Sequence, residues 1–124
     1  YKYKTIIFYN KYNKKKISLL NKLYVKTYKI PKDVDGKIDL QESLVKAKKL
    51  GFSRIFLESG INLIRNFYNK NLINEFKIFV SKDKLGKNGS IKVKNDLYSF
   101  LRYKKKNKEI VNLNGDFFFS YNIK

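Results

Sequence analysis

The residues best placed for chemistry lie in one short segment, Glu58-Ser59-Gly60. An apolar run, 54–57, precedes the carboxylate of Glu58, and a helical pattern begins directly after Gly60. Ligands of open α/β sheets bind beyond the carboxyl ends of strands, and N–H groups at a helix start attract phosphate. The segment is therefore a candidate phosphate or cofactor site. The alternative is an ordinary strand-to-helix turn capped by Glu58 or Ser59, which the motif alone favours because such short motifs often occur by chance.

The residue types that the sequence lacks exclude several chemistries. The 124 residues contain no His and no Cys, which excludes histidine acid–base catalysis, a cysteine nucleophile, a His/Cys zinc site and a disulfide. No stretch approaches the roughly 20 apolar residues that span a bilayer, and nothing at the start resembles a signal peptide. We expect a cytoplasmic protein. The length suits one domain, 1–124, and because no Met precedes Tyr1 we expect that domain to be incomplete at its start.

The net charge of +19 first suggests nucleic acid as a partner. However, 26 of the 29 basic residues are Lys, and the chain is also rich in Asn, Ile, Tyr and Phe. These residues share codons rich in A and T, whereas selection for phosphate binding would favour the bidentate fork of Arg. A bias in base composition therefore explains the charge better than nucleic-acid binding does.

The hydrophobic pattern alternates strands and helices over the first two-thirds of the chain, as expected for an α/β sheet with helical crossovers. The best-marked helix has Asp39 as its N-cap, Glu42 as capping-box partner and Gly51 as its stop. Strands without helices follow, which suggests antiparallel strands at an edge of a mostly parallel sheet. The expected strands are 5–9, 24–30, 54–57 (buried), 76–80, 90–94, 109–113 and 117–123, and the expected helices are 14–23, 40–50 and 61–72.

Two features near the end of the chain sharpen this expectation. Asn114-Gly115 separates the last two strand patterns and is typical of a tight hairpin turn. The run Phe117-Phe118-Phe119 could form a binding surface, but a fully buried strand is the more economical interpretation.

The order of motifs resembles the reductase domain of the bifunctional riboflavin-biosynthesis deaminase/reductase (RibD type). That family shows an Asp-Leu helix start, a Gly, an apolar strand, and Glu followed by Gly-Gly or Ala-Gly. A helix, an acidic element, a further strand and a Leu-Gly-Gly-type loop come next. The corresponding residues are Asp39-Leu40, Gly51, 54–57, Glu58-Ser59-Gly60, 72–75, 76–80, Leu85-Gly86 and Gly115-Asp116. The sequence departs from the pattern at Ser59, Ile61-Asn62 and Asn74.

The resemblance implies a dihydrofolate-reductase-like fold and an NADPH-dependent reduction of the ribosyl group of 5-amino-6-(5-phosphoribosylamino)uracil to ribityl. By position, Glu58 would contact the substrate, and Arg65 could reach the 2′-phosphate of NADPH. The cofactor would follow Gly60, Ile61, Asn62, Leu63, Ile64, Arg65 and Asn66. No catalytic residue is assigned, and no metal, nucleic acid or membrane is expected. The resemblance further implies a homodimer, a zinc deaminase domain in the full-length protein, and an upstream part that completes the catalytic unit.

Two alternatives stay open. A small basic nucleic-acid-binding module would use the Tyr-flanked triplets 14–16 and 104–106, although solvated loop lysines are the simpler interpretation. A decayed reductase-like domain would serve only dimerisation. Gly86 and Gly89 could cradle a phosphate, but a mobile hairpin loop is at least as good an interpretation.

Overall fold

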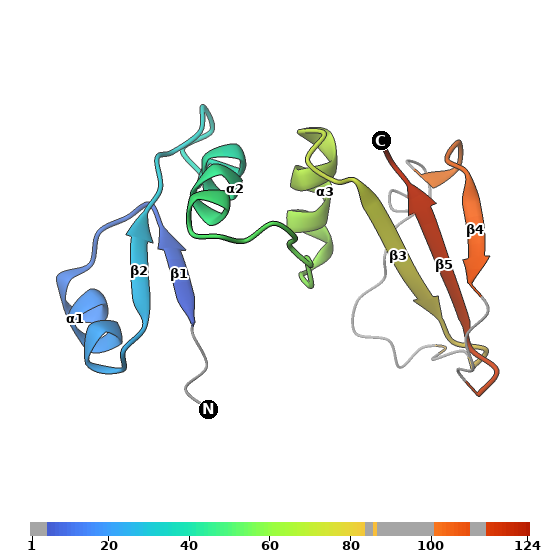
Figure 1. The fold of residues 1–124 in the computed structure, drawn as a ribbon, viewed down its shortest axis with the longest axis horizontal. Helices are drawn as coiled ribbons and strands as arrows, with labels where there is room; N and C mark the ends of the chain where they lie inside the picture. Colours follow the sequence, from blue (N-terminus) through green and yellow to red (C-terminus); the bar gives the residue numbers. More distant parts are fainter. Residues whose placement is uncertain (1–4, 84–85, 87–100, 110–113) are drawn as a thin grey trace. The chain divides into compact units, whose positions relative to one another are not determined.

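The computed structural model describes residues 5–83, 86, 101–109 and 114–124. The chain divides into two compact units, Tyr1–Phe56 and Leu57–Lys124. Figure 1 shows the elements of each unit along the chain. The expected strand 90–94 and most of the expected strand 109–113 lie outside the described residues.

The first unit begins with a β-α-β arrangement. Strands β1 (Ile6–Tyr9) and β2 (Lys26–Lys29) pair in parallel, with Ile6 opposite Lys26 and Tyr9 opposite Lys29. Helix α1 (Lys14–Lys22) connects them, as a parallel pair requires. Its N-cap is Asn13, whose side-chain oxygen accepts a hydrogen bond from the Lys16 N–H at 3.0 Å. The strand–helix–strand prediction for this region is confirmed.

Helix α2 (Leu40–Lys49) forms where its terminal signals predict it. The Asp39 carboxylate accepts hydrogen bonds from the N–H groups of Gln41 at 2.9 Å and Glu42 at 3.1 Å. At the other end, Gly51 has a φ of +94°, a conformation that glycine adopts without a Cβ penalty. The predicted capping box with Glu42 is wrong. A capping box needs the Glu42 side chain to accept a hydrogen bond from the Asp39 N–H. Instead, the Asp39 N–H donates to the Pro31 carbonyl at 3.0 Å.

The buried core of the first unit is small. Among the described residues, it consists of Ile30 directly after β2, and of Leu40 and Ala47 on α2. The ammonium of Lys46 lies 4.3 Å from the centre of the Tyr28 ring, so a cation–π contact also joins α2 to β2.

The expected buried strand 54–57 is wrong. This segment forms no strand and has no ladder partner in the described structure, and Figure 1 draws it as coil. Ile55 is 53% exposed and Phe56 72% exposed. An apolar, β-branched run becomes a buried strand only when a neighbouring strand supplies hydrogen bonds and a covering layer, and β1 and β2 pair only with each other among the described residues.

Among its described residues, the second unit contains helix α3 and a three-stranded sheet. Helix α3 spans Ile61–Asn69, and strands β3 (Glu75–Val80), β4 (Lys106–Glu109) and β5 (Phe117–Asn122) form an antiparallel sheet in the order β3-β5-β4. The helix ends before Leu72, where the sequence pattern placed its end. Asn71 adopts a left-handed φ of +53°, and the Leu72 N–H donates a hydrogen bond to the Phe67 carbonyl at 2.9 Å, which terminates the helix.

The turn before β5 has the backbone conformation that its Asn-Gly sequence predicts. Asn114 and Gly115 have φ angles of +51° and +95°, and left-handed conformations at both central residues favour Asn-Gly. The prediction that 117–119 is fully buried is wrong, because Phe117 is 40% exposed and the next two residues, Phe118 and Phe119, are only half-buried. A three-stranded sheet buries side chains only where another layer covers it. Leu101 and Ser120 are buried in this unit.

The two units together confirm the mixed α/β class. A parallel pair joined by a helix comes first, two further helices follow, and antiparallel strands end the chain. Within the described residues, no helix has the length and apolar character needed to cross a membrane.

Candidate cofactor-binding site

The start of α3 has no side-chain cap. Gly60 occupies the N-cap position in an extended conformation, with φ −66° and ψ 156°. Its carbonyl accepts hydrogen bonds from the N–H groups of Leu63 at 3.1 Å and Ile64 at 3.3 Å. The first helical residues, Ile61 and Asn62, precede these donors, and the first turn of α3 contains no acidic residue. Their N–H groups are the ones that a helix normally offers to a cap or to an anion.

The alternative in which Glu58 or Ser59 caps this helix is therefore wrong. Glu58 is exposed, and Ser59 directs its hydroxyl to the Gly60 carbonyl at 3.4 Å. The structure also leaves room beside the N-cap. A Cβ added to Gly60 would have no atom of the surrounding structure within 4 Å. Open space and a helix start without a capping side chain are what a phosphate group requires, so these residues fit the implied cofactor.

The predicted cofactor-binding residues divide into two groups. Gly60, Ile61, Asn62 and Leu63 form the opening turn, where backbone N–H groups can face a ligand. The remaining three, Ile64, Arg65 and Asn66, lie in the next turn and are half-buried. Since successive helical residues are 100° apart around the axis, one ligand cannot touch the side chains of all six residues that follow Gly60.

The charged residues of the predicted site differ in their surroundings. Arg65 is half-buried and already interacts with another group of the protein. Glu58 is exposed and follows a segment that is not a paired strand, so its carboxylate is not held at the end of a sheet as the sequence suggested. The structure thus gathers Gly60 to Leu63 in one turn but does not fix Glu58 by a strand.

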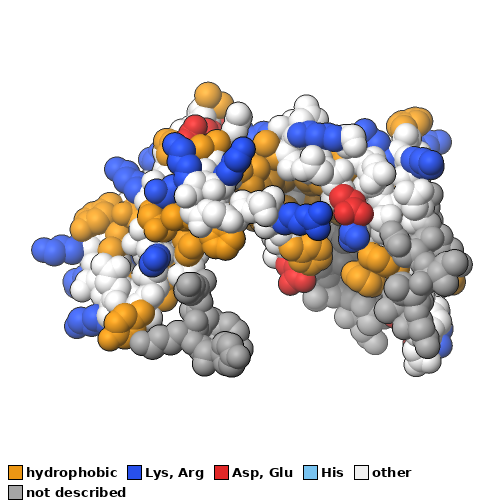
Figure 2. Space-filling model, in the orientation of Figure 1, with side chains coloured by type: hydrophobic (Ala, Val, Ile, Leu, Met, Phe, Trp, Pro, Cys, Tyr) orange, Lys and Arg blue, Asp and Glu red, His pale blue; other side chains and the backbone are white. Residues whose placement is uncertain are grey.

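The positive charge of the described residues is dispersed over the face that Figure 2 shows. Figure 2 shows Lys and Arg side chains scattered over the visible face and not gathered in one stripe. In the first basic triplet, Lys14 to Lys16 are exposed at the start of α1. In the second, Lys104 has a structural role, because its ammonium donates to the Ile123 carbonyl at 2.9 Å. In the part of the chain that the structure describes, no group of acidic residues could hold a metal ion. Of the glycine loop, only Gly86 is described.

The sequence interpretation missed the role of Asp116. Its carboxylate oxygen accepts hydrogen bonds from the Ser81 hydroxyl and from the Lys82 N–H, both at 3.1 Å. The Lys82 ammonium in turn donates to the Asn114 carbonyl at 3.1 Å. These bonds join the end of β3 to the turn that begins β5. No local signal in the sequence indicated this role, because both partners of Asp116 lie more than 30 positions away.

Comparison with known proteins gives a family for this chain. Residues 2–114 match the family described as the RibD C-terminal domain. None of the curated proteins matches the chain. The match covers most of the 124 residues, including the whole of α3 and the Glu58-Ser59-Gly60 segment. It agrees with the ordered motifs and with the mixed α/β fold. The chain belongs to the RibD C-terminal domain family, the reductase domain of riboflavin biosynthesis.

Proposed function

We propose that this chain takes part in the NADPH-dependent reduction of the ribosyl group of 5-amino-6-(5-phosphoribosylamino)uracil to a ribityl group. The observation that carries the proposal is the start of α3, where Gly60 leaves the helix without a side-chain cap and leaves open space beside it. Family membership supports a reductase role in general. The helix start adds a place in this chain for a phosphate of the cofactor.

The backbone of the opening turn would hold that phosphate. The N–H groups of Ile61 and Asn62 would donate to its oxygens, and the amide of the exposed Asn62 side chain would add a further donor. The positive end of the helix dipole favours an anion there by about 0.3–1 kcal/mol. Because no carboxylate lies in the first turn of α3, no fixed negative charge there opposes the phosphate.

Two side chains would give specificity. Arg65 lies one turn into α3 and would favour the 2′-phosphate of NADPH over the hydroxyl of NADH, since guanidinium groups bind phosphate well. Glu58 would accept hydrogen bonds from the amino or hydroxyl groups of the substrate, because an ionised carboxylate is only an acceptor. When bound, NADPH supplies the hydride that reaches C1 of the ring-opened ribosyl group. The chain's own contribution is to position the two molecules.

We infer that the chain forms only part of the catalytic unit. No acid that could donate a proton to the substrate is assigned among its residues. The segment 54–57, which the sequence predicts as a sheet strand, has no ladder partner among the described residues. Deamination must come from another domain, because the zinc deaminases need His and Cys ligands and this sequence has neither.

A binding experiment on this chain tests the cofactor site. Isothermal titration of NADPH and NADH into the wild-type chain and into Arg65→Gln would measure four dissociation constants. We expect the wild type to prefer NADPH by about tenfold or more, as expected for one charge-assisted hydrogen-bonding partner worth 1.5–3 kcal/mol, and Arg65→Gln to lose most of that preference. Equal affinity of the wild type for both cofactors would contradict the role of Arg65.

A further inference from the structure

The turn before β5 contains a dipeptide that is chemically suited to modify itself. Asn114 and Gly115 are exposed, with left-handed φ angles of +51° and +95°. The backbone nitrogen that follows an Asn can attack the carbonyl carbon of the Asn side chain, because the new bond closes a five-membered ring. A Cβ on the following residue hinders this attack, and Gly115 has none. The turn therefore combines an accessible Asn with an unhindered nitrogen nucleophile.

The attack needs a negative charge on the peptide group between the two residues. A peptide nitrogen is a poor nucleophile until it loses its proton. Resonance within the peptide group then places much of the negative charge on the carbonyl oxygen. In this turn, that oxygen belongs to Asn114. A positive group in contact with the Asn114 carbonyl therefore favours the reactive form of the Gly115 nitrogen.

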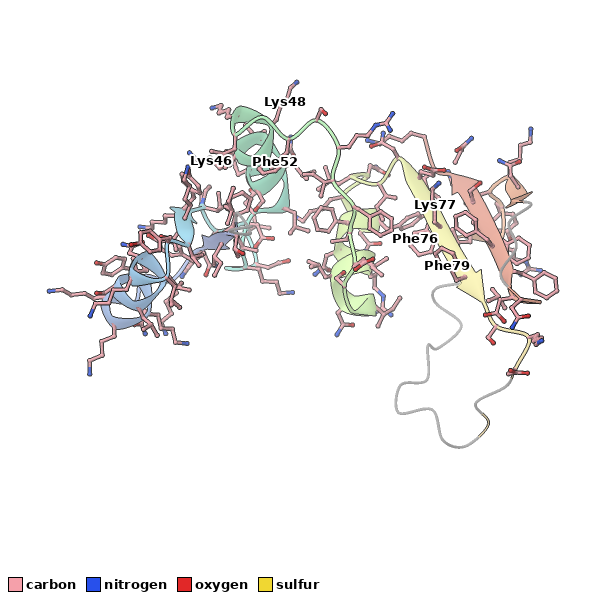
Figure 3. All side chains as sticks on the ribbon, turned by 60° about the horizontal axis from the view of Figure 1, so that its bottom comes forward. Lys46, Lys48, Phe52, Phe76, Lys77 and Phe79 are labelled. Atoms are coloured by element: carbon pink, nitrogen blue, oxygen red, sulfur yellow. The ribbon has the colours of Figure 1, made fainter. Side chains whose placement is uncertain are left out.

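Lys82 supplies this positive group. It follows β3 closely, the strand on which Figure 3 labels Phe79. Its ammonium donates a hydrogen bond to the Asn114 carbonyl at 3.1 Å. The side chain also lies across the turn, because a Cβ added to Gly115 would come within 2.9 Å of the Lys82 Cδ and 3.0 Å of its Nζ. The ammonium thus contacts the peptide group that must become negative.

Backbone and side-chain bonds hold Lys82 beside the turn. Its N–H donates to the Asp116 carboxylate at 3.1 Å, and the Ser81 hydroxyl donates to the same oxygen at 3.1 Å. The sheet adds to this tie, since Val80 pairs with Phe117 in the ladder between β3 and β5. The folded structure therefore brings an ammonium to a turn that lies 32 positions away in the sequence.

We propose that Asn114 is a site of spontaneous deamidation that Lys82 promotes. The Gly115 nitrogen gives its proton to solvent and attacks the side-chain carbonyl carbon of Asn114. The new C–N bond replaces the bond to the amide nitrogen, which takes a proton from solvent and leaves as ammonia. Water then adds its hydroxyl to one of the two carbonyl carbons of the cyclic imide and its proton to the ring nitrogen. One water is consumed, one ammonia is released, and position 114 becomes an aspartate or an isoaspartate.

The two products change the turn differently. An aspartate keeps the backbone and adds a negative charge beside the Lys82 ammonium. An isoaspartate carries the main chain through the former side chain, which adds one carbon to the backbone of the turn. This added carbon should loosen the hydrogen bonds that Asp116 makes with the end of β3. The chain that carries isoaspartate should therefore be less stable than the fresh chain.

Tandem mass spectrometry of the chain after incubation at neutral pH measures the reaction. We expect the mass change from amide to carboxylate to accumulate at Asn114, and Gly115→Ala to suppress it. The same dipeptide recurs at Asn88-Gly89, outside the described residues. Its conversion in each sample serves as an internal reference for the incubation.

Two substitutions of Lys82 separate promotion of the reaction from simple support of the turn. Lys82→Gln keeps a donor for the Asn114 carbonyl but carries no charge. It should slow the conversion of Asn114 by about two- to fivefold, as expected for an interaction between exposed charged groups, whereas Lys82→Arg should stay close to the wild type. If Lys82 only held the turn closed, Lys82→Gln would react faster than the wild type.

Two controls complete the experiment. Lys77→Gln removes a charge of the same unit that pairs with Glu75 and should leave the rate unchanged. In concentrated urea, wild type and Lys82→Gln should react equally, because unfolding separates Lys82 from the turn. Circular dichroism checks that each variant is folded without urea. The proposal is overturned if the folded wild type does not convert at Asn114 while the unfolded chain does, if folded Lys82→Gln converts at least as fast as the wild type, or if the difference between them persists in urea.

Discussion

Placing an aspartate at Gly60 should stabilise the fold and weaken NADPH binding at the same time. The chain contains its own template for this substitution. In α2, Asp39 adopts φ −71° and ψ 115° and accepts hydrogen bonds from the N–H groups of the second and third helical residues, at 2.9 and 3.1 Å. Gly60 has a similar extended conformation, with φ −66° and ψ 156°, and no side-chain cap. Gly60→Asp can therefore cap α3 without backbone strain.

The expected stability gain is small but measurable. Aspartate caps a helix better than glycine by a few tenths of a kcal/mol, and its charge at the positive end of the helix adds about 0.3–1 kcal/mol. A gain of about 0.5–1 kcal/mol would raise the unfolding temperature of a chain of this size by roughly 2–5 °C. Steric cost is absent at the Cβ, because nothing lies within 4 Å of its position.

The same carboxylate should exclude the cofactor. It would occupy the N–H groups that the proposed site offers to phosphate and would repel the phosphate charge. Losing one charge-assisted hydrogen bond, worth about 1.5–3 kcal/mol, weakens binding by about 10- to 150-fold. Gly60→Ala is the control, since it adds a Cβ without a capping oxygen or a charge.

Thermal unfolding followed by circular dichroism and calorimetric titration of NADPH would measure both effects. Opposite changes in stability and affinity for Gly60→Asp, with smaller changes for Gly60→Ala, are the expected result. If Gly60→Asp raises the unfolding temperature and binds NADPH as tightly as the wild type, the cofactor does not use the start of α3. If the unfolding temperature falls, the reasoning from the Asp39 cap is refuted.

Three further predictions concern the fold and can be measured by denaturant unfolding. Asp39→Ala removes the acceptor of two N–H groups at the start of α2 and should cost about 1 kcal/mol, whereas Asp39→Ser should retain most of the stability; equal losses would argue against capping. Gly51→Ala forces a Cβ into a φ of +94° and should cost about 1 kcal/mol or more, and an unchanged midpoint would contradict the left-handed stop of α2. Asp116→Ala removes the acceptor of the Ser81 and Lys82 hydrogen bonds and should cost about 1–3 kcal/mol, while Asp116→Asn should lose less because it keeps an oxygen; a larger loss for Asn than for Ala would refute this role.

The elements with strong local signals could be predicted from the sequence. Asp39 and Gly51 mark the two ends of α2 by their own backbone preferences, and Asn114-Gly115 dictates its turn. The start of α3 after Gly60 could also be located. In each case the determining interactions lie within a few residues of one another.

Burial could not be predicted in the same way, because it depends on distant partners. The apolar run 54–57 has the composition of a buried strand, yet Phe56 is 72% exposed because no described strand lies beside it. The burial of the run 117–119 was overestimated for the same reason: Phe117 is 40% exposed, and Phe118 and Phe119 are only half-buried. Asp116 was missed because its partners, Ser81 and Lys82, lie more than 30 positions away in the sequence.

The central claim is that this chain of the RibD C-terminal domain family serves an NADPH-dependent reduction. The most direct measurement follows NADPH absorbance while the full-length protein that contains this chain is given 5-amino-6-(5-phosphoribosylamino)uracil, with product analysis for the ribityl compound. We expect one NADPH to be oxidised for each ribityl product, and we expect Gly60→Asp to slow the reaction at low NADPH concentration. Formation of no ribityl product by the full-length protein, with NADPH left unoxidised, would contradict the claim.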